Sequence, residues 1–122
     1  MKISLCAAVA VMAAITPARA TQPQFINTAD LLTAYDQGDA SSRQLILLGL
    51  AQTVGGMELA NIELQTRGNS PLYCRPPQLM LTGEQVLDMI RRYSAAHSDI
   101  RDSSYAVAIL RAAEDAFPCT GK

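Results

Sequence analysis

The segment that decides the fold opens with Tyr73-Cys74-Arg75-Pro76-Pro77 and closes with Phe117-Pro118-Cys119. Between the two cysteines lie two amphipathic segments and a short, largely polar connection. If the cysteines form a disulfide, this part of the chain becomes a closed loop. In the chain-entropy model, closing a loop of this size raises the free energy of unfolding by roughly 4 kcal/mol. The fold therefore depends on whether the compartment of the protein allows a disulfide.

The N-terminal residues predict export to an oxidising compartment. Lys2 precedes a largely apolar run over residues 3–15, and Ala18-Arg19-Ala20 has the small-x-small form of a cleavage site. The alternative is a membrane anchor, but the apolar run is shorter than the ~20 residues that a spanning helix needs. We therefore expect a signal peptide over residues 1–20, cut after Ala20, and a periplasmic protein.

Cleavage of this signal peptide would leave an even number of cysteines. The sequence has three, and Cys6 is removed with the signal peptide, so Cys74 and Cys119 become the one possible intramolecular pair. The exported chain, residues 21–122, has the length of one small domain. It is mildly acidic without a basic cluster, which argues against nucleic-acid binding, and we expect no membrane contact after cleavage.

The hydrophobic periodicity predicts an all-α fold, a small single-domain bundle of about four to five helices with one disulfide. The helices are expected at about 28–36, from 39–42 to about 65, from 82 to about 96, and from 102–103 to 117. Thr82 and Gln85 have the pattern of a capping box at the start of the third helix, and Asp102 or Ser103 is expected to cap the fourth. A short loop joins the last two helices, so we expect an antiparallel pair, which would bring the two cysteines to the same end.

The second predicted helix is apolar nearly all round at its start, which is typical of a central core helix or of a subunit interface. Its buried stripe is expected to contain Leu47, Leu50, Val54, Met57 and Ile62. Gly55 and Gly56 interrupt the helix, and each glycine costs about 1 kcal/mol relative to alanine. A tolerated kink and the close approach of another helix explain this pair equally well. The candidates for a dimer contact are therefore Leu47, Leu50, Val54, Gly55 and Gly56.

Few residues could support catalysis. His97 is the single histidine, and both remaining cysteines are expected to be oxidised, so a Cys–His nucleophilic pair is not expected. The sequence has no metal-ligand cluster, phosphate loop or Gly-x-Ser-x-Gly motif, and Glu58 and Glu63 are expected on a solvated helix face. By elimination we expect a binding protein without cofactor or metal, not an enzyme.

The order of these segments resembles the Rap/Tai immunity proteins, the periplasmic partners of amidase effectors of type VI secretion. The similarity covers roughly 28–120 and is carried by Leu48-Gly49-Leu50-Ala51, by Tyr73-Cys74-Arg75-Pro76-Pro77 and by Ala116-Phe117-Pro118-Cys119. The second cysteine pair that such proteins often carry is absent, because the matching positions are Tyr35 and about Leu47.

The resemblance implies a small all-α protein, often a homodimer, that blocks the active-site cleft of a papain-like Cys–His peptidoglycan amidase. Two irregular segments are candidates for the blocking surface. The first contributes His97, Ser98, Asp99, Arg101 and Asp102, and the second, over residues 65–75, contributes Arg67, Asn69 and Tyr73. Rigidity lowers the ordering cost of binding, which favours the first. An ordinary solvated turn is the alternative for both.

Two other function classes remain open at this point. One is a periplasmic acid-stress chaperone, and the other is an inhibitor of a different cell-wall hydrolase, such as a lysozyme. Chaperones of the first kind usually have many titrating groups and charged tails, whereas this chain has one histidine. We therefore rank the chaperone behind the immunity protein.

Overall fold

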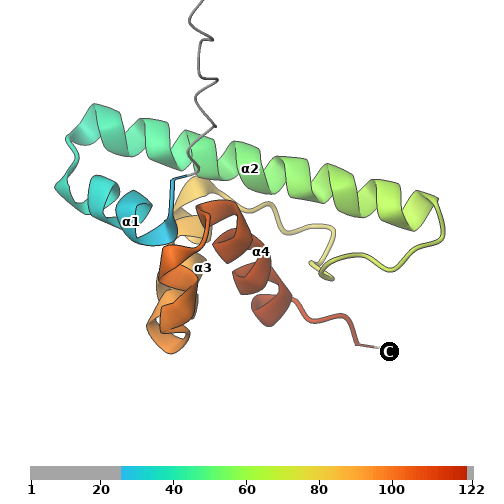
Figure 1. Ribbon diagram of the computed structural model, residues 1–122. Coiled ribbons are helices and arrows are strands. Elements are labelled where there is room, and N and C mark those ends of the chain that lie inside the picture. The colour runs from blue at the N-terminus through green and yellow to red at the C-terminus, as the bar shows by residue number, and fades with distance from the viewer. Residues whose placement is uncertain (1–25, 121–122) are drawn as a thin grey trace, which may run out of the picture.

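The structure is a computed structural model that describes residues 26–120, and this part of the chain is helical with one isolated β-bridge (Figure 1). The elements are α1 (Thr28–Gln37), α2 (Ala40–Thr66), α3 (Gly83–Ala96), the 3-10 helix η1 (Ser98–Asp102) and α4 (Tyr105–Ala116). The prediction of a small all-α domain with one disulfide is confirmed. The predicted signal peptide, residues 1–20, lies outside the described residues.

Side-chain caps determine where α2 and α3 begin. The Ser42 amide donates a hydrogen bond to Asp39 Oδ1 over 2.8 Å, directly ahead of α2. Thr82 and Gln85 form the predicted capping box at the start of α3. These caps satisfy backbone amides that have no partner inside the helix, which is why short-range sequence signals locate both starts correctly.

The start of α4 differs from the prediction. Its N-cap is Ser104, whose hydroxyl accepts a hydrogen bond from the Ala106 amide over 3.3 Å, and not Asp102 or Ser103. The Ser103 carbonyl instead accepts hydrogen bonds from the amide of Thr28 (2.8 Å) and from its hydroxyl (3.0 Å). Thr28 is fully buried, so this contact joins the start of α1 to the entrance of α4.

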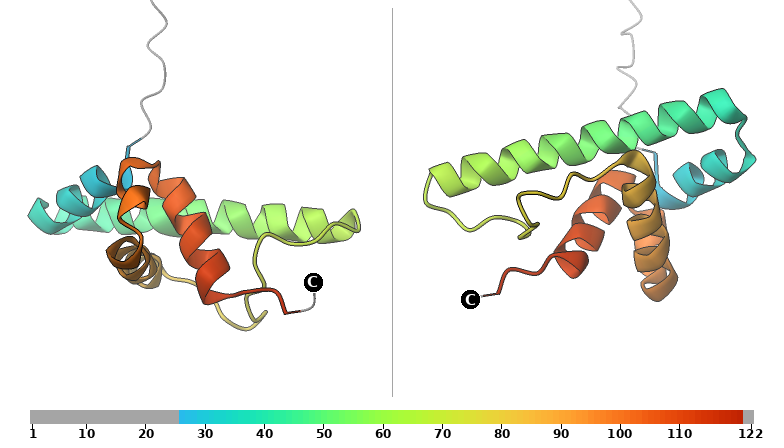
Figure 2. Two further views of the ribbon diagram at one scale, coloured as in Figure 1. Left: turned by 60° about the horizontal axis from the view of Figure 1, so that its bottom comes forward. Right: turned by 180° about the vertical axis from the view of Figure 1, so that it is seen from behind.

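α2 is the long axis of the molecule, and the other described elements lie along one side of it (Figures 1 and 2). α1 folds back beneath its first turns, whereas α3 and α4 lead away from it, and residues 67–82 return along its second half. No described element covers the opposite side of α2.

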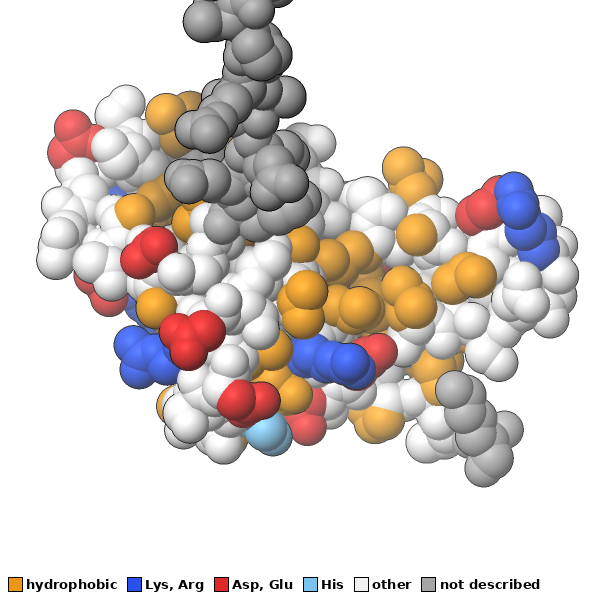
Figure 3. Space-filling model, in the orientation of Figure 1, with side chains coloured by type: hydrophobic (Ala, Val, Ile, Leu, Met, Phe, Trp, Pro, Cys, Tyr) orange, Lys and Arg blue, Asp and Glu red, His pale blue; other side chains and the backbone are white. Residues whose placement is uncertain are grey.

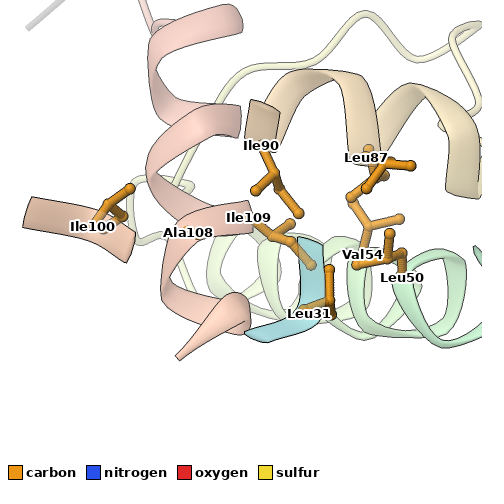
Figure 4. Packing of buried hydrophobic residues seen from close by; sticks show 9 residues of the cluster. Leu31, Leu50, Val54, Leu87, Ile90, Ile100, Ala108 and Ile109 are labelled. Carbon is orange, nitrogen blue, oxygen red and sulfur yellow. The ribbon is translucent and has the colours of Figure 1, made fainter. Parts of the chain in front are cut away.

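The main core forms where α1, α2, α3 and α4 meet (Figure 4). Leu50 from α2, Ile90 from α3 and Ile109 from α4 are each at most 1% exposed. The other members of this cluster are Leu31, Val54, Val86, Leu87, Ile100 and Ala108. Complete burial of a leucine or isoleucine is worth about 1.5–3 kcal/mol, so this cluster is the main source of stability.

Gly83 brings the start of α3 directly against α2. A Cβ atom on Gly83 would lie 2.2 Å from the carbonyl oxygen of Leu47, so the two backbones are in contact here. Any side chain at this position would push the helices apart, and Gly83 therefore sets the distance between α2 and α3.

The predicted antiparallel arrangement of the last two helices is wrong. Both α3 and α4 begin near α2 and lead away from it (Figure 1), and the C-terminal residues of both helices line one hollow, which includes Ala96 and Ala116. The chain returns through η1 and two extended residues. Five residues of 3-10 helix at about 2 Å each, followed by extended chain, cover most of the ~21 Å length of the 14-residue α3.

The buried stripe of α2 also differs from the prediction towards its end. Ile62 is 58% exposed, and Asn61 is buried in its place. Asn61 Nδ2 donates to the carbonyl of Tyr73 (3.2 Å), and Asn61 Oδ1 accepts from the amide of Leu72 (2.7 Å). Burial of this polar side chain is possible because these bonds satisfy it.

Candidate functional site

The first candidate surface is the connection between α3 and α4, residues 97–104, which we call the 97–104 turn. Three contacts hold its backbone. The His97 amide donates to the Tyr93 carbonyl over 2.9 Å, the Ile100 side chain is only 7% exposed, and the Ser103 carbonyl accepts two bonds from Thr28. Because the turn is attached at its start, middle and end, its conformation is fixed by the bundle.

Most side chains of the 97–104 turn project into solvent. The five predicted here, His97, Ser98, Asp99, Arg101 and Asp102, are all exposed. Within residues 26–120, the side chains of Asp99, Arg101 and Asp102 take part in no hydrogen bond or ion pair. Two carboxylates and one guanidinium therefore remain available to a partner.

His97 lies beside a small hollow. Its ring stacks on that of Tyr93, with centroids 4.1 Å apart and an interplanar angle of 15°, and its Nδ1 lies 3.1 Å from the Tyr93 carbonyl. The hollow has a volume of about 220 Å³, and its lining includes Met89, Arg92, Tyr93, His97, Ala112 and Asp115. A partner side chain could insert here, next to the exposed charges of the turn.

The second candidate surface, residues 65–75, lies at the far end of α2 (Figure 1). Arg67 donates to Glu63 over 2.6 Å in an exposed ion pair, and Asn69 is exposed. Gly68 has φ of 76°, a left-handed conformation that ends the helix. The structure therefore does not bring the two predicted surfaces together.

Tyr73 is wrongly predicted as part of this second surface, because it is only 1% exposed. Its hydroxyl donates to Glu58 Oε1 over 2.8 Å. Arg75 donates from Nε to Oε1 (2.9 Å) and from Nη2 to Oε2 (3.1 Å) of the same carboxylate. Glu58 therefore fastens residues 73–75 to α2, whereas the sequence placed it on a solvated face.

The cluster of Glu58, Tyr73 and Arg75 affects the ionisation of its members. Burial alone would raise the pKa of Glu58, but hydrogen bonds from Arg75 and Tyr73 and the charge of Arg75 outweigh burial and lower it. Burial and the bond to Glu58 raise the pKa of Tyr73 far above its ordinary value. At neutral pH the cluster is therefore an ionised Glu58–Arg75 pair with a neutral tyrosine donor.

Cys74 and Cys119 form the predicted disulfide, with their Cα atoms 4.9 Å apart. The Cys74 amide also donates to the Phe117 carbonyl over 2.8 Å. The bridge ties the middle of the 67–82 connection to the segment that follows α4. The reason given for the pairing, an antiparallel arrangement of α3 and α4, was wrong. The end of α4 and the start of α3 do not lie together, and residues 74–82 span the distance between them (Figure 1).

The structure separates the residues predicted for a dimer contact. Leu50 and Val54 are 0% and 4% exposed in the core of the chain itself, so they cannot contact a partner, and Leu47 is half-buried. Gly55 and Gly56 are exposed on the opposite side of α2.

The large apolar residues that α2 does expose were missed. They are Leu45, Leu48, Leu59 and Ile62. The signal for them was the apolar character of the helix all round its circumference. Apolar residues all round α2 indicated that one side of the helix would stay uncovered, but they did not indicate which residues lie on that side.

Among residues 26–120, no group of three or more His, Cys, Asp or Glu side chains is placed to hold a metal ion. The 97–104 turn and the exposed side of α2 are the two surfaces available for recognition. Comparison with known proteins finds no matching family model, no matching curated protein and no matching solved structure.

Proposed function

We propose that this chain is a periplasmic immunity protein that binds a peptidoglycan amidase effector of type VI secretion and blocks its active-site cleft. The resemblance of residues 28–120 to the Rap/Tai proteins supports the class of partner. The observation that carries the proposal is the 97–104 turn, whose backbone is held by Ile100 and Thr28 while its charged side chains are exposed.

A protein that blocks a cleft needs a projection that keeps its shape. Ordering a flexible loop on binding costs about 0.5–1.5 kcal/mol for each side chain that is immobilised, and fixed backbone removes the corresponding cost for the main chain. The 97–104 turn is held before a partner arrives, and it begins at the end of α3 that points away from α2 (Figure 1). This geometry supports the turn as the inserting element.

The charges of the turn support specific pairing. Asp99, Arg101 and Asp102 place both signs of charge within four residues, and no described residue neutralises them. Complementary charges in a partner cleft would steer association and determine the docking orientation. The hollow beside His97 offers a place for a side chain from the rim of the cleft.

The test is co-purification of the chain with a candidate type VI amidase effector, followed by an assay of cell-wall hydrolysis. We expect the wild-type chain to bind and to suppress hydrolysis. Asp99→Arg and Arg101→Glu should each weaken binding by about 30-fold or more, because reversal of a buried interfacial charge costs about 2 kcal/mol or more.

Arg67→Glu is the matched control. It reverses another exposed charge, at the far end of α2, and binding should change by less than about threefold. If no variant weakens binding, the 97–104 turn is not the blocking element. If the wild-type chain leaves hydrolysis unchanged and instead suppresses protein aggregation at low pH, the chain belongs to the chaperone class.

A further inference from the structure

The hollow beside His97 lies where two helices end. α3 ends at Ala96 and α4 ends at Ala116, and both of these residues line the hollow. A helix C-terminus carries a partial negative charge, which a basic side chain in the last turn can offset. Neither α3 nor α4 has a basic residue in its last turn. The backbone at this place therefore favours a positive charge in the hollow.

Asp115 adds a full negative charge to the lining of the hollow. It is the second-to-last residue of α4, where a carboxylate opposes the helix dipole. Its neighbour Glu114 pairs with Arg111 over 2.9 Å, whereas the side chain of Asp115 takes part in no hydrogen bond or ion pair within residues 26–120. The carboxylate thus disfavours the helix end without a compensating contact in the described chain, and a cation supplied by a partner would account for its place.

His97 contributes a hydrogen-bond acceptor and part of an aromatic wall. Its Nδ1 lies 3.1 Å from the carbonyl oxygen of Tyr93, and because a carbonyl only accepts, Nδ1 carries the proton in this contact. In a neutral imidazole the other ring nitrogen, Nε2, is then an acceptor. The imidazole also stacks on the ring of Tyr93. Both residues line the hollow, so two stacked rings and a carboxylate share its surface.

Arg92 is the one cation among the described residues that line this hollow, and its charge is compensated. Its Nη2 lies 2.9 Å from Oδ2 of Asp88, and Asp88 lines the neighbouring hollow instead of this one. The guanidinium of Arg92 is therefore held towards the neighbouring hollow. Figure 3 shows acidic side chains around the single histidine, at the end of the molecule away from α2. The charges of these surroundings thus favour a cationic ligand.

The remaining walls of the hollow suit an aliphatic stem. They are apolar and come from Met89, Ala96, Ala112 and Ala116, around a volume of about 220 Å³. An arginine side chain has an apolar stem and a planar head that donates several hydrogen bonds and stacks on aromatic rings. These properties match the apolar walls, the two acceptors and the stacked rings. We propose that this hollow binds an arginine side chain of a partner protein, with the guanidinium between Asp115 and the Tyr93–His97 stack.

Two other cations fit this hollow less well. A metal ion needs several ligands, and within residues 26–120 no group of three or more His, Cys, Asp or Glu side chains is placed to supply them. A lysine ammonium is a compact, strongly hydrated point charge, whereas a guanidinium stacks flat on aromatic rings. The proposed function places this hollow at the rim of the amidase cleft, and only the identity of the protein that carries the arginine rests on that function.

The test uses the single histidine of the chain, because the ring-carbon protons of His97 give NMR signals that no other residue gives. The exported chain is titrated with N-acetyl-argininamide to about 50 mM, a range that covers millimolar affinities. We expect saturable shifts of the His97 signals. N-acetyl-citrullinamide, a neutral molecule of nearly the same shape, should bind about fivefold more weakly, because it lacks the charge that pairs with Asp115.

Asp115→Asn should weaken the binding of N-acetyl-argininamide about fivefold for the same reason. Glu84→Gln is the matched control, because it removes an exposed carboxylate from the first turn of α3, at the opposite end of that helix. The control variant should bind as the wild type does. Circular dichroism must show the same helix content in both variants.

Three results would overturn the proposal: the absence of a saturable shift, equal affinity for the citrulline compound, or no effect of Asp115→Asn. Equal or tighter binding of N-acetyl-lysinamide would overturn the assignment to arginine. The titration contains no amidase, so its failure would not affect the role of the 97–104 turn, and failure of the co-purification would not affect the proposed arginine site. If both proposals hold, Asp115→Asn should also weaken amidase binding about fivefold.

Discussion

The two long connections between helices within residues 26–120 are fixed by different means. Residues 67–82 are held by bonds to other elements: the Cys74–Cys119 disulfide, the two bonds from Arg75 to Glu58 and the side chain of Asn61. The shorter 97–104 turn is held by packing of Ile100 and by hydrogen bonds from Thr28. A rigid binding element therefore does not require a cross-link when a helix bundle encloses one of its side chains.

The largest expected effect is loss of the disulfide that fastens the longer connection. Cys119→Ser should lower the free energy of unfolding by up to about 4 kcal/mol, because the closed loop no longer limits the unfolded chain. Urea denaturation measures it. The double variant Cys74→Ser/Cys119→Ser controls for the free thiol. An unchanged midpoint would mean that the Glu58 cluster and Asn61 alone hold residues 67–82.

The next effect tests the packing of the shorter connection. Ile100→Ala should cost about 3 kcal/mol, the usual range for a truncated core aliphatic residue. Hydrogen exchange should accelerate in residues 97–104 more than in residues 67–82 if the turn depends on this side chain. Faster exchange in both segments alike would show that Ile100 supports the bundle and not the turn in particular.

A smaller effect is expected from the polar contacts of the longer connection. Arg75→Met removes two bonds to Glu58 and keeps most of the apolar stem, and it should cost about 2 kcal/mol. Arg67→Met removes an ion pair whose side chains are 70% and 58% exposed, so it should change stability by at most about 0.5 kcal/mol. Equal effects would contradict the role assigned to Glu58.

The smallest effect is a pH dependence. Because folding lowers the pKa of Glu58 from its ordinary value of 4.5, its contribution is present above that value and is lost as the pH falls through the lower folded pKa. The stability difference between wild type and Glu58→Gln should therefore narrow as the pH is lowered from neutral to below 4.5. Thermal unfolding over this range measures it, and a constant difference would contradict the ionised pair.

Short-range signals in the sequence predict the starts of α2 and α3 well. Asp39 and the pair Thr82 and Gln85 act on amides within a few residues of themselves, so no knowledge of the tertiary fold is needed to locate the starts of α2 and α3. The disulfide could be predicted because the expected cut after Ala20 would leave only Cys74 and Cys119.

Contacts between distant segments account for the failures. The direction of α4 depends on burial of Ile100 inside a connection that is otherwise polar. A single isoleucine in a polar segment gives no periodicity from which its burial could be predicted. Burial of Asn61 and Tyr73 depends on hydrogen-bond partners in other elements. Tyr73 was wrongly assigned to the second surface for the same reason. The exposed residues of the 97–104 turn are polar or charged, and residues of these types are mostly exposed, so their exposure could be predicted from their identity.

The disulfide also determines what a break in the backbone would do. A single cut between residues 74 and 119, including one after Arg101 in the exposed turn, leaves two pieces that are still joined covalently through Cys74 and Cys119. A cut between α1 and α2 has no such safeguard, because only non-covalent contacts, among them the Asp36–Arg91 ion pair, would then hold α1 to the rest of the described chain. Damage by a protease at the proposed binding element would thus leave the molecule in one piece.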